Sequence, residues 1–564
     1  MNAHGVFWLG LAFFLPWLLA SVAALPGVRR YCLGLLPFAS LPALGVALWM
    51  PGGAVLTAPD LLLGMQLALD DGGRGFLGAA AFLWCVAGLY ARRYLRRDPH
   101  RAGFAALWCL TLAGNLGVFL AADVVTFYAC FACVSLAAYP LVIHERDARA
   151  RRAGLVYIVL ALIGETCLLL GFMLAVSGSP ELGIPEVRAA IAGSPWRAAI
   201  LGLLFAGFGI KAGLVPLHVW LPLAHPAAPT PASAVLSGAI VKAGIFGLIQ
   251  FLPFGLALPG WHQILLWCGL VSAFYGMVAG LAQHNPKTVL AYSTVSQMGL
   301  VAALLAMALQ QGPPQAALAV AGFYALHHGL AKGALFLGVG VAASSGGRAL
   351  RAVLIVLALP ALSLAGFPLL GGALAKLGAK LVLGEGVTTL LFTVSAIGTA
   401  LLMLRFLFLL KGEGTASAGA NARAPAGLLL PWWAAVAASV VAPWAWFTAA
   451  TGLAASYPLA LGNLWAAAWP VAVAAVLAWL ARRSGWRAPA IPEGDLLVPL
   501  VAAGARLASW FPTRFRGLAR LRLPAWRPTL QRWFDAGSAR AERSLSRWSI
   551  SGVLLLALAI LAAF

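Results

Sequence analysis

Charged residues are scarce in this chain. Of its 564 residues only 10% are Asp, Glu, Lys or Arg, whereas 62% are hydrophobic, and soluble proteins usually carry about 25% charged residues. This shortage excludes an ordinary soluble globular protein. The segments 6–25, 155–177 and 353–370 are almost continuously apolar, and each is close to the roughly 20 residues with which a helix crosses a bilayer. The sequence therefore predicts an all-α polytopic membrane protein.

Ligands for metals and cofactors are also few. The seven cysteines lie in or beside apolar stretches, without the paired spacing of a disulfide framework. Cys130 and Cys133 form a C-x-x-C pattern inside a predicted span with no second pair nearby, which favours buried packing over metal binding. The chain has no dinucleotide-binding loop, flavin motif or cluster-ligand set. We therefore expect no cofactor and no metal, and we expect any redox chemistry to reside in partner subunits.

The basic residues indicate a membrane topology. The net charge is +22, but the arginines form short blocks between apolar runs, which favours a positive-inside signal over nucleic-acid binding. The arginines fall in alternate loops, so we expect the chain to lie in a cell inner membrane with both termini outside the cytoplasm. We also expect no cleaved signal peptide. The basic loops are those at 29–30, 92–101, 146–152, 287, 348–351 and 411–423, together with the region 482–547.

The apolar runs predict about sixteen spans, with two inverted repeats of five helices each. Five spans fall in each repeat, and an odd number reverses the orientation of the second copy. Each repeat also contains Gly/Pro signals for a broken helix, at 211–216 and at 367–372. The predicted spans are 5–25, 31–50, 76–91, 102–121, 123–143, 154–176, 197–217, 229–252, 261–282, 288–310, 316–343, 351–370 continuing to 384, 387–410, 428–450, 459–481 and 549–564. The expected domains are 1–101 (N-terminal helices), 102–252 and 261–410 (two half-channels), 411–481 (additional helices), 482–548 (a basic amphipathic interfacial segment) and 549–564 (a last helix).

Lysine and arginine are distributed differently. Five of the seven lysines fall inside predicted spans, whereas the arginines keep to loops and span ends apart from Arg405. Burial of five lysines would cost on the order of 12–17 kcal/mol on the insertion scale. A desolvated lysine can release a proton near neutral pH and an arginine cannot, so we expect a proton pathway. Snorkelling to the interface remains an alternative, chiefly for Lys380. The five lysines inside predicted spans are Lys211, Lys242, Lys332, Lys376 and Lys380.

Other titratable groups accompany these lysines. Glu165 is the acidic residue deep in an apolar run, and it needs a buried cation as partner. His328 and Lys332 lie one helical turn apart with His327 beside them, a pattern that favours a proton relay over a metal site. Three further candidates are weaker: Asp123 fits a helix cap, and His218 and His225 flank helix breaks, where a structural hydrogen bond competes with proton uptake.

Several motifs in the middle of the chain resemble one family. They are GIKAGLVPLHVWLP at 209–222, AHPAAPTP at 224–231, SGAIVKAG at 237–244, KTVLAYSTVSQ at 287–297, the His327, His328 and Lys332 group, and LAGFP at 364–368 leading to Lys376. Together they resemble the antiporter-like proton-channel subunits of NADH:quinone oxidoreductase, Mrp Na⁺/H⁺ antiporters and membrane-bound hydrogenases. The resemblance covers roughly residues 102–410.

The resemblance implies a role for each motif. It implies two inverted five-helix bundles and a lateral proton path along the membrane midplane. Lys211 would match the broken-helix lysine, Lys242 the connecting lysine, the His327, His328 and Lys332 group the relay helix, and Lys376 the exit-side lysine. The family's glutamate partner for the broken-helix lysine is missing, because Phe131 and Ala132 stand where the Trp-Glu pair would be. Glu165, one helix later, is our expected substitute.

These observations predict a proton-translocating subunit of a respiratory, hydrogenase-like or Mrp-type complex, which works with other membrane subunits and possible soluble redox subunits. It would be part of an NADH:quinone oxidoreductase-like translocase without a redox centre of its own. Two alternatives remain: a stand-alone Na⁺/H⁺ or small-solute transporter, and a structural subunit with vestigial channels.

Overall fold

A computed structural model describes residues 3–25, 31–179, 181–256, 258–310, 314–417, 421–485 and 491–496 of the chain. It is almost entirely helical. The elements are α1 (Ala3–Ala24), α2 (Cys32–Leu35), η1 (Phe38–Ser40), α3 (Leu41–Trp49), β1 (Val55–Ala58), β2 (Met65–Ala68), α4 (Asp71–Tyr94), α5 (Arg101–Leu120), α6 (Val124–Val142), α7 (Ala148–Val176), α8 (Ile184–Gly193), α9 (Arg197–Ala212), α10 (Trp220–Ala227), α11 (Thr230–Val235), η2 (Leu236–Ile240), α12 (Val241–Phe251), α13 (Pro259–Leu281), α14 (Pro286–Met307), α15 (Gln315–Ala343), α16 (Gly347–Ala365), α17 (Gly371–Leu383), α18 (Val387–Ser417), α19 (Ala426–Thr451), η3 (Tyr457–Leu459) and α20 (Leu461–Arg483).

Fourteen helical segments in the described part of the chain are long and apolar enough to cross a membrane. This confirms the polytopic all-α fold, but not the count of sixteen. The span expected at 197–217 appears as α9, which ends after 16 residues and is therefore too short for a full crossing. The span expected at 549–564 lies outside the described residues.

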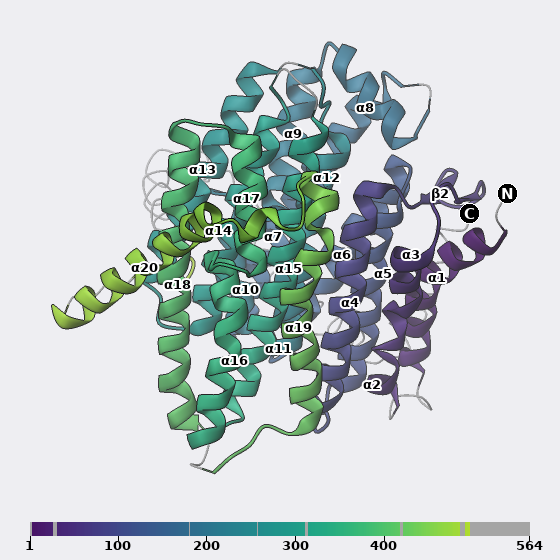
Figure 1. Cartoon of the computed structure of the whole chain (residues 1–564). Coiled ribbons are helices and arrows are strands. Elements are labelled where there is room, and N and C mark those ends of the chain that lie inside the picture. Colours follow the sequence, from purple (N-terminus) through teal and green to yellow (C-terminus); the bar gives the residue numbers. More distant parts are fainter. Residues whose placement is uncertain are drawn as a thin grey trace, which may run out of the picture.

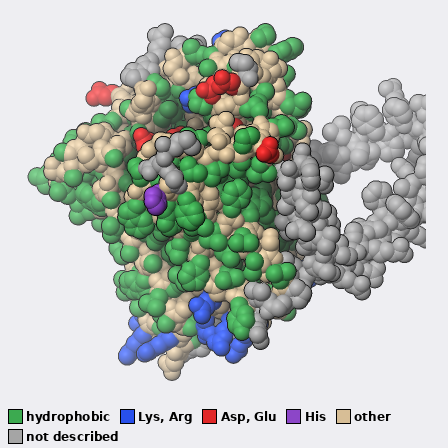
Figure 2. Space-filling model, turned by 90° about the vertical axis from the view of Figure 1, so that its right-hand side faces the viewer, with side chains coloured by type: hydrophobic (Ala, Val, Ile, Leu, Met, Phe, Trp, Pro, Cys, Tyr) green, Lys and Arg blue, Asp and Glu red, His purple; other side chains and the backbone are tan. Residues whose placement is uncertain are grey.

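The side chains are sorted along the long axis of the molecule. Most helices stand side by side, while α20 runs obliquely and extends beyond the bundle (Figure 1). On the face that Figure 2 shows, hydrophobic side chains cover the middle, most Lys and Arg side chains gather at one end, and Asp and Glu side chains lie toward the other. This distribution is what a lipid-exposed belt between two aqueous faces requires. We call the end with the Lys and Arg side chains the basic face.

The helices at the centre of the bundle are buried on all sides. The apolar windows of α14 and α15 are wholly enclosed by other helices, whereas only 11% of the corresponding window of α20 is buried. A lipid-facing helix exposes apolar residues, but an enclosed helix can carry polar groups that pair with its neighbours. The centre of the bundle is therefore where a polar pathway can be built.

Two helix breaks have the same construction. At the end of α9, Gly213 adopts a left-handed conformation (φ 75°), and at the end of α16, Gly366 does the same (φ 89°). In both cases the next residue donates its backbone N–H to a carbonyl at the end of the helix, Leu214 to Gly209 and Phe367 to Leu362. Glycine provides this turn without the steric penalty of a side chain. The breaks predicted from Gly and Pro thus lie where the sequence places them.

A small hairpin covers the end of the bundle opposite the basic face. β1 and β2 pair antiparallel, with Val55 opposite Ala68. Asp123 accepts a hydrogen bond from the backbone of Thr126 at the start of α6 (2.7 Å) and another from Gln66 of β2 (2.8 Å). The carboxylate therefore caps α6 and ties the hairpin to it.

The expected basic segment 482–548 lies largely outside the described residues. Of it, the structure describes 482–485 and 491–496. In the second of these pieces, Asp495 is buried against helices of the bundle.

Candidate functional site

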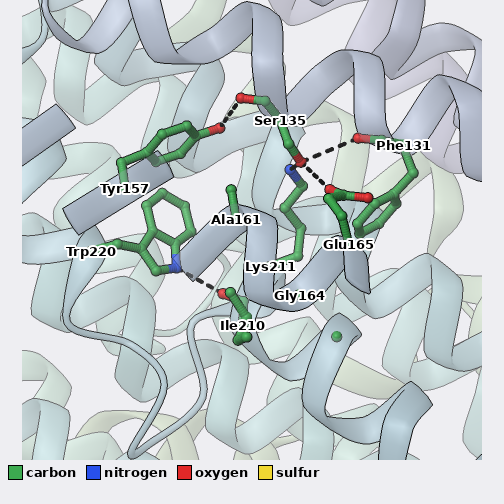
Figure 3. A pocket seen from close by; sticks show the side chains of 10 residues that line it. Phe131, Ser135, Tyr157, Ala161, Gly164, Glu165, Ile210, Lys211 and Trp220 are labelled. Carbon is green, nitrogen blue, oxygen red and sulfur yellow. Dashed lines mark hydrogen bonds between the residues drawn. The ribbon is translucent and has the colours of Figure 1, made fainter. Parts of the chain in front are cut away.

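Glu165 and Lys211 meet at the hydroxyl of Ser135. Lys211 Nζ on α9 donates to Ser135 Oγ on α6, and Ser135 Oγ donates to Glu165 Oε1 on α7 at 2.5 Å. Figure 3 shows the three side chains converging from three helices. The Ser135 hydroxyl therefore links the carboxylate and the ammonium group, because it accepts a hydrogen bond from one and donates a hydrogen bond to the other.

The triad is buried and lines a small cavity. Glu165 and Lys211 are 7% and 5% exposed, and the Lys211 ammonium group lies 4.9 Å from the centre of the Phe131 ring. Tyr157 Oη donates to the Ser135 carbonyl at 3.0 Å. Tyr157 and Trp220 line a cavity together with the three residues of the triad (Figure 3). An isolated charge in such a place is expensive, so each member of the pair depends on the other.

Glycines allow the helices of the triad to approach closely. A Cβ on Gly207 of α9 would lie 2.9 Å from the Gly164 carbonyl of α7, next to Glu165. A Cβ on Gly244 of α12 would lie 2.6 Å from backbone atoms of α9, beside Lys211. Small residues at such crossings let backbones of membrane helices touch, and here they bring the charged side chains together.

A second pair joins α12 to α15. Lys242 Nζ lies 2.8 Å from His328 Nδ1 and 2.5 Å from the Ser237 carbonyl. Ser237 belongs to η2, a single π-helical turn between α11 and α12, and such turns occur frequently at functional sites. The backbones of η2 and α15 cross closely at Gly329, so the pair is held by the crossing itself.

The other two residues of the expected relay, His327 and Lys332, lie on α15 on either side of His328. Lys332 Nζ donates to the Leu290 carbonyl of α14 at 2.8 Å. His327 packs against the first residues of α17, where a Cβ on Gly371 would lie 2.6 Å from its Nδ1. Neither ring nitrogen of His327 has a hydrogen-bond partner among the described residues. A buried imidazole in this state is a natural site for ordered water.

Lys376 lies at the second break. Its Nζ donates to the Ala365 carbonyl at 2.6 Å, at the end of α16, although the lysine itself belongs to α17. Lys211 instead precedes its break, so the two lysines do not occupy equivalent positions along their broken helices. Lys211 lies in the last turn of α9, and Lys376 Nζ lies at the carbonyl end of α16, so both are near a helix C-terminus, where a positive charge is favourable. Lys380 is half-buried and lines a cavity together with Lys376.

His218 and His225 have different surroundings. His218 Nε2 lies 3.0 Å from Asp495 Oδ2, in a pair that is almost completely buried. The His225 ring stacks on Phe336 with 4.6 Å between centroids, and its two nitrogens have no partner within the described part of the chain. The structure thus gives His218 an acidic partner that the sequence did not indicate.

The structure brings together Glu165 with Lys211, and Lys242 with His328, but leaves gaps between these groups. Lys332 and Lys376 bind backbone carbonyls. Sequence reasoning missed Ser135, Ser237 and Asp495, since serines are common in membrane helices and Asp495 stands in a mainly basic region. No cluster of three or more metal-ligating side chains occurs within the described residues.

A family model described as "NADH:quinone oxidoreductase/Mrp antiporter, TM" matches residues 121–404. Hydrogenase-4 component B of Escherichia coli (strain K12) is 33% identical over 288 residues, which are 49% of this chain and 43% of that protein. A Na(+)/H(+) antiporter component of Bacillus subtilis (strain 168) is 26% identical over 388 residues, 65% of this chain and 78% of that protein. The first of these matches spans less than half the length of the relative.

Two solved structures are similar over most of the chain. A chain of the Mrp complex from Dietzia sp. DQ12-45-1b superposes with a TM-score of 0.69 and 25% identity, covering 99% of this chain and 62% of that one. A chain of the membrane-bound sulfane sulfur reductase, an archaeal respiratory membrane complex, gives a TM-score of 0.65 at 20% identity, covering 84% of this chain and 98% of that one. The second likeness concerns the fold alone.

Proposed function

Because the chain belongs to the NADH:quinone oxidoreductase/Mrp antiporter transmembrane family, we propose that it is the proton-translocating membrane subunit of a multi-subunit complex of respiratory, hydrogenase or Mrp type. The observation that carries the proposal is the Glu165, Ser135 and Lys211 triad, in which a buried carboxylate and a buried amine share one hydroxyl. This arrangement can hold a proton in two places inside the membrane.

The proposed route uses two half-channels, 102–252 and 261–410, as inverted repeats. The matching constructions of the Gly213 and Gly366 breaks support this assignment. Protons would pass between Lys211, the Lys242 and His328 pair, and Lys376, with water bridging groups that do not touch. Lys332 and His327 would serve the relay helix, and Lys380 the cavity beside Lys376.

Location and partners follow from the same reasoning. We place the chain in a cell inner membrane with the basic face toward the cytoplasm, and therefore with both termini outside it. The chain carries no redox motif, so partner subunits would supply the energy. The relatives named for hydrogenase and antiporter functions support an assembly of this kind.

Substitution of Lys211 tests the function. Lys211→Met keeps most of the bulk and removes the exchangeable proton, and Lys211→Arg keeps a charge that does not leave at neutral pH. We expect both variants to assemble and both to lower proton flux by at least about tenfold in the reconstituted parent complex.

The matched control is Lys411→Met, because Lys411 is an exposed lysine toward the end of α18. It should leave flux unchanged. Flux at the unmodified level in Lys211→Arg would show that a fixed charge is sufficient, and the relay role would have to be abandoned.

A further inference from the structure

A short acidic segment lies against the basic face of the bundle. Residues 491–496 follow α20 in the chain and dock through several side chains. Glu493 accepts from Arg149 at 2.9 and 3.0 Å and from Thr288 at 3.0 Å. Gln283 donates to the segment's backbone at 3.1 Å. These contacts join the segment to the starts of α7 and α14 and to the end of α13.

Beyond these surface contacts, Asp495 reaches into the bundle. Its Oδ2 accepts hydrogen bonds from His218 Nε2 at 3.0 Å, from Tyr275 Oη at 2.8 Å and from Tyr292 Oη at 2.8 Å. Asp495 is 6% exposed and His218 is fully buried. The donors come from the α9–α10 connection, α13 and α14, so four separate parts of the chain meet at one carboxylate oxygen.

The groups around Asp495 favour its ionised form. Burial raises the pKa of the Asp495 carboxyl, but the hydrogen bond and charge of His218, and the Tyr292 hydroxyl, outweigh burial and keep the pKa below its ordinary value. The His218 imidazole pairs with this carboxylate. His218 Nδ1 is buried and has no hydrogen-bond partner among the described residues. When Nε2 carries the hydrogen that Asp495 accepts, Nδ1 of the neutral imidazole can accept a further proton and pass it on.

Two members of the cluster lie close in sequence to residues that hold or follow groups of the proposed route. His218 follows the Gly213 break that ends the helix of Lys211. Tyr292 lies on α14 two residues after Leu290, whose carbonyl accepts the hydrogen bond from Lys332. A proton on the cluster is therefore next to elements that carry groups of the proposed route.

We propose that Asp495 and His218 form the proton-loading site at which the route opens to the basic face. This inference rests on the proposed function. The pair takes a proton from water at that face and passes it to a water or titratable group of the route, which returns the pair to its starting state. Only the proton moves, and no other bond is made or broken. Glu493 anchors the segment and takes no part in the transfer.

The test compares two charge-removing variants of the same segment. Asp495→Asn keeps the size and an acceptor oxygen but loses the carboxylate, whereas Glu493→Gln makes an equal change in the anchor. In the reconstituted parent complex, we expect Asp495→Asn to lower proton flux by about tenfold or more at normal assembly. Asp495→Glu should recover part of the flux, and Glu493→Gln should stay near the unmodified level.

Each outcome bears on the proposal. Equal losses in Glu493→Gln and Asp495→Asn would show that the segment is only a tether, and unmodified flux in Asp495→Asn would overturn the loading site. If Asp495→Asn does not assemble, His218→Gln keeps a donor for Asp495 without a titratable ring, and unmodified flux there overturns the proposal too. Lys211→Met separates the two ideas: if it blocks flux while Asp495→Asn does not, only the loading site fails, and if it leaves flux intact, the proposed function fails.

Discussion

The Ser135 hydroxyl contacts both Glu165 and Lys211. The two charged groups therefore depend on an atom that can donate to one while it accepts from the other. The carboxylate belongs to α7 and the serine to α6. Sequence reasoning could propose Glu165 from its isolation in an apolar run, but it could not find Ser135, whose partner lies 30 residues away on another helix.

Substitution of Ser135 by alanine should uncouple this pair. Each charged group would lose a hydrogen-bond partner in a buried place, which costs about 1–3 kcal/mol. We expect a lower melting temperature and a proton flux reduced by about tenfold or more, by the energy-to-rate conversion. Ser439→Ala is the control, because Ser439 is a buried serine whose hydroxyl donates to a backbone carbonyl of its own helix. If both variants conduct equally well, the shared hydroxyl has no part in the transfer.

At the scale of elements, the helix breaks were the most predictable part of the fold. Glycine followed by proline specifies a left-handed turn and a missing backbone donor, and this local chemistry depends little on the rest of the chain. The length of α9 and the π-helical turn η2 were not predictable in the same way. They arise where α15 and α12 cross their neighbours at glycines such as Gly329 and Gly244, and these crossings are set by tertiary packing.

The second break offers a test at this scale. A methyl group on Gly366 would lie 2.8 Å from Lys376 Nζ, whereas one on Gly452 would meet nothing within 4 Å. Both glycines are left-handed (φ 89° and 70°), so alanine costs a similar backbone strain of about 1–2 kcal/mol at each. Gly366→Ala should also displace the ammonium group and lower proton flux, while Gly452→Ala should lower only the melting temperature. Equal flux in the two variants would show that the position of Lys376 does not matter.

For the whole molecule, composition and the alternation of basic loops predicted the class and the sorting of charge between two faces. These are averages over many residues, so a single misplaced boundary changes them little. The contacts of residues 491–496 could not be predicted in this way, because they depend on individual residues and not on averages. Glu493 and Asp495 stand among basic residues in the sequence, and only the folded chain brings them to Arg149 and His218.

Orientation is the prediction at this scale. A short epitope inserted after Ser456, between α19 and α20, should bind antibody in intact spheroplasts and not in sealed inverted vesicles. The same epitope after Arg96, just beyond the end of α4, should give the reverse pattern. Both sites lie in exposed connections. Reactivity of the Arg96 insertion in intact spheroplasts would invert the proposed topology.

The acidic segment also has a consequence for how the protein is made. Asp495 lies 277 residues after His218 and 203 residues after Tyr292, so the ribosome completes the relay helices long before it adds this carboxylate. Domains and helices generally form as the chain emerges. During biosynthesis the half-built protein would therefore sit in the bilayer with its lysines in place but without the group that we propose loads them. If Asp495 loads the route, we expect the nascent chain not to dissipate the proton gradient of the membrane into which it is being inserted.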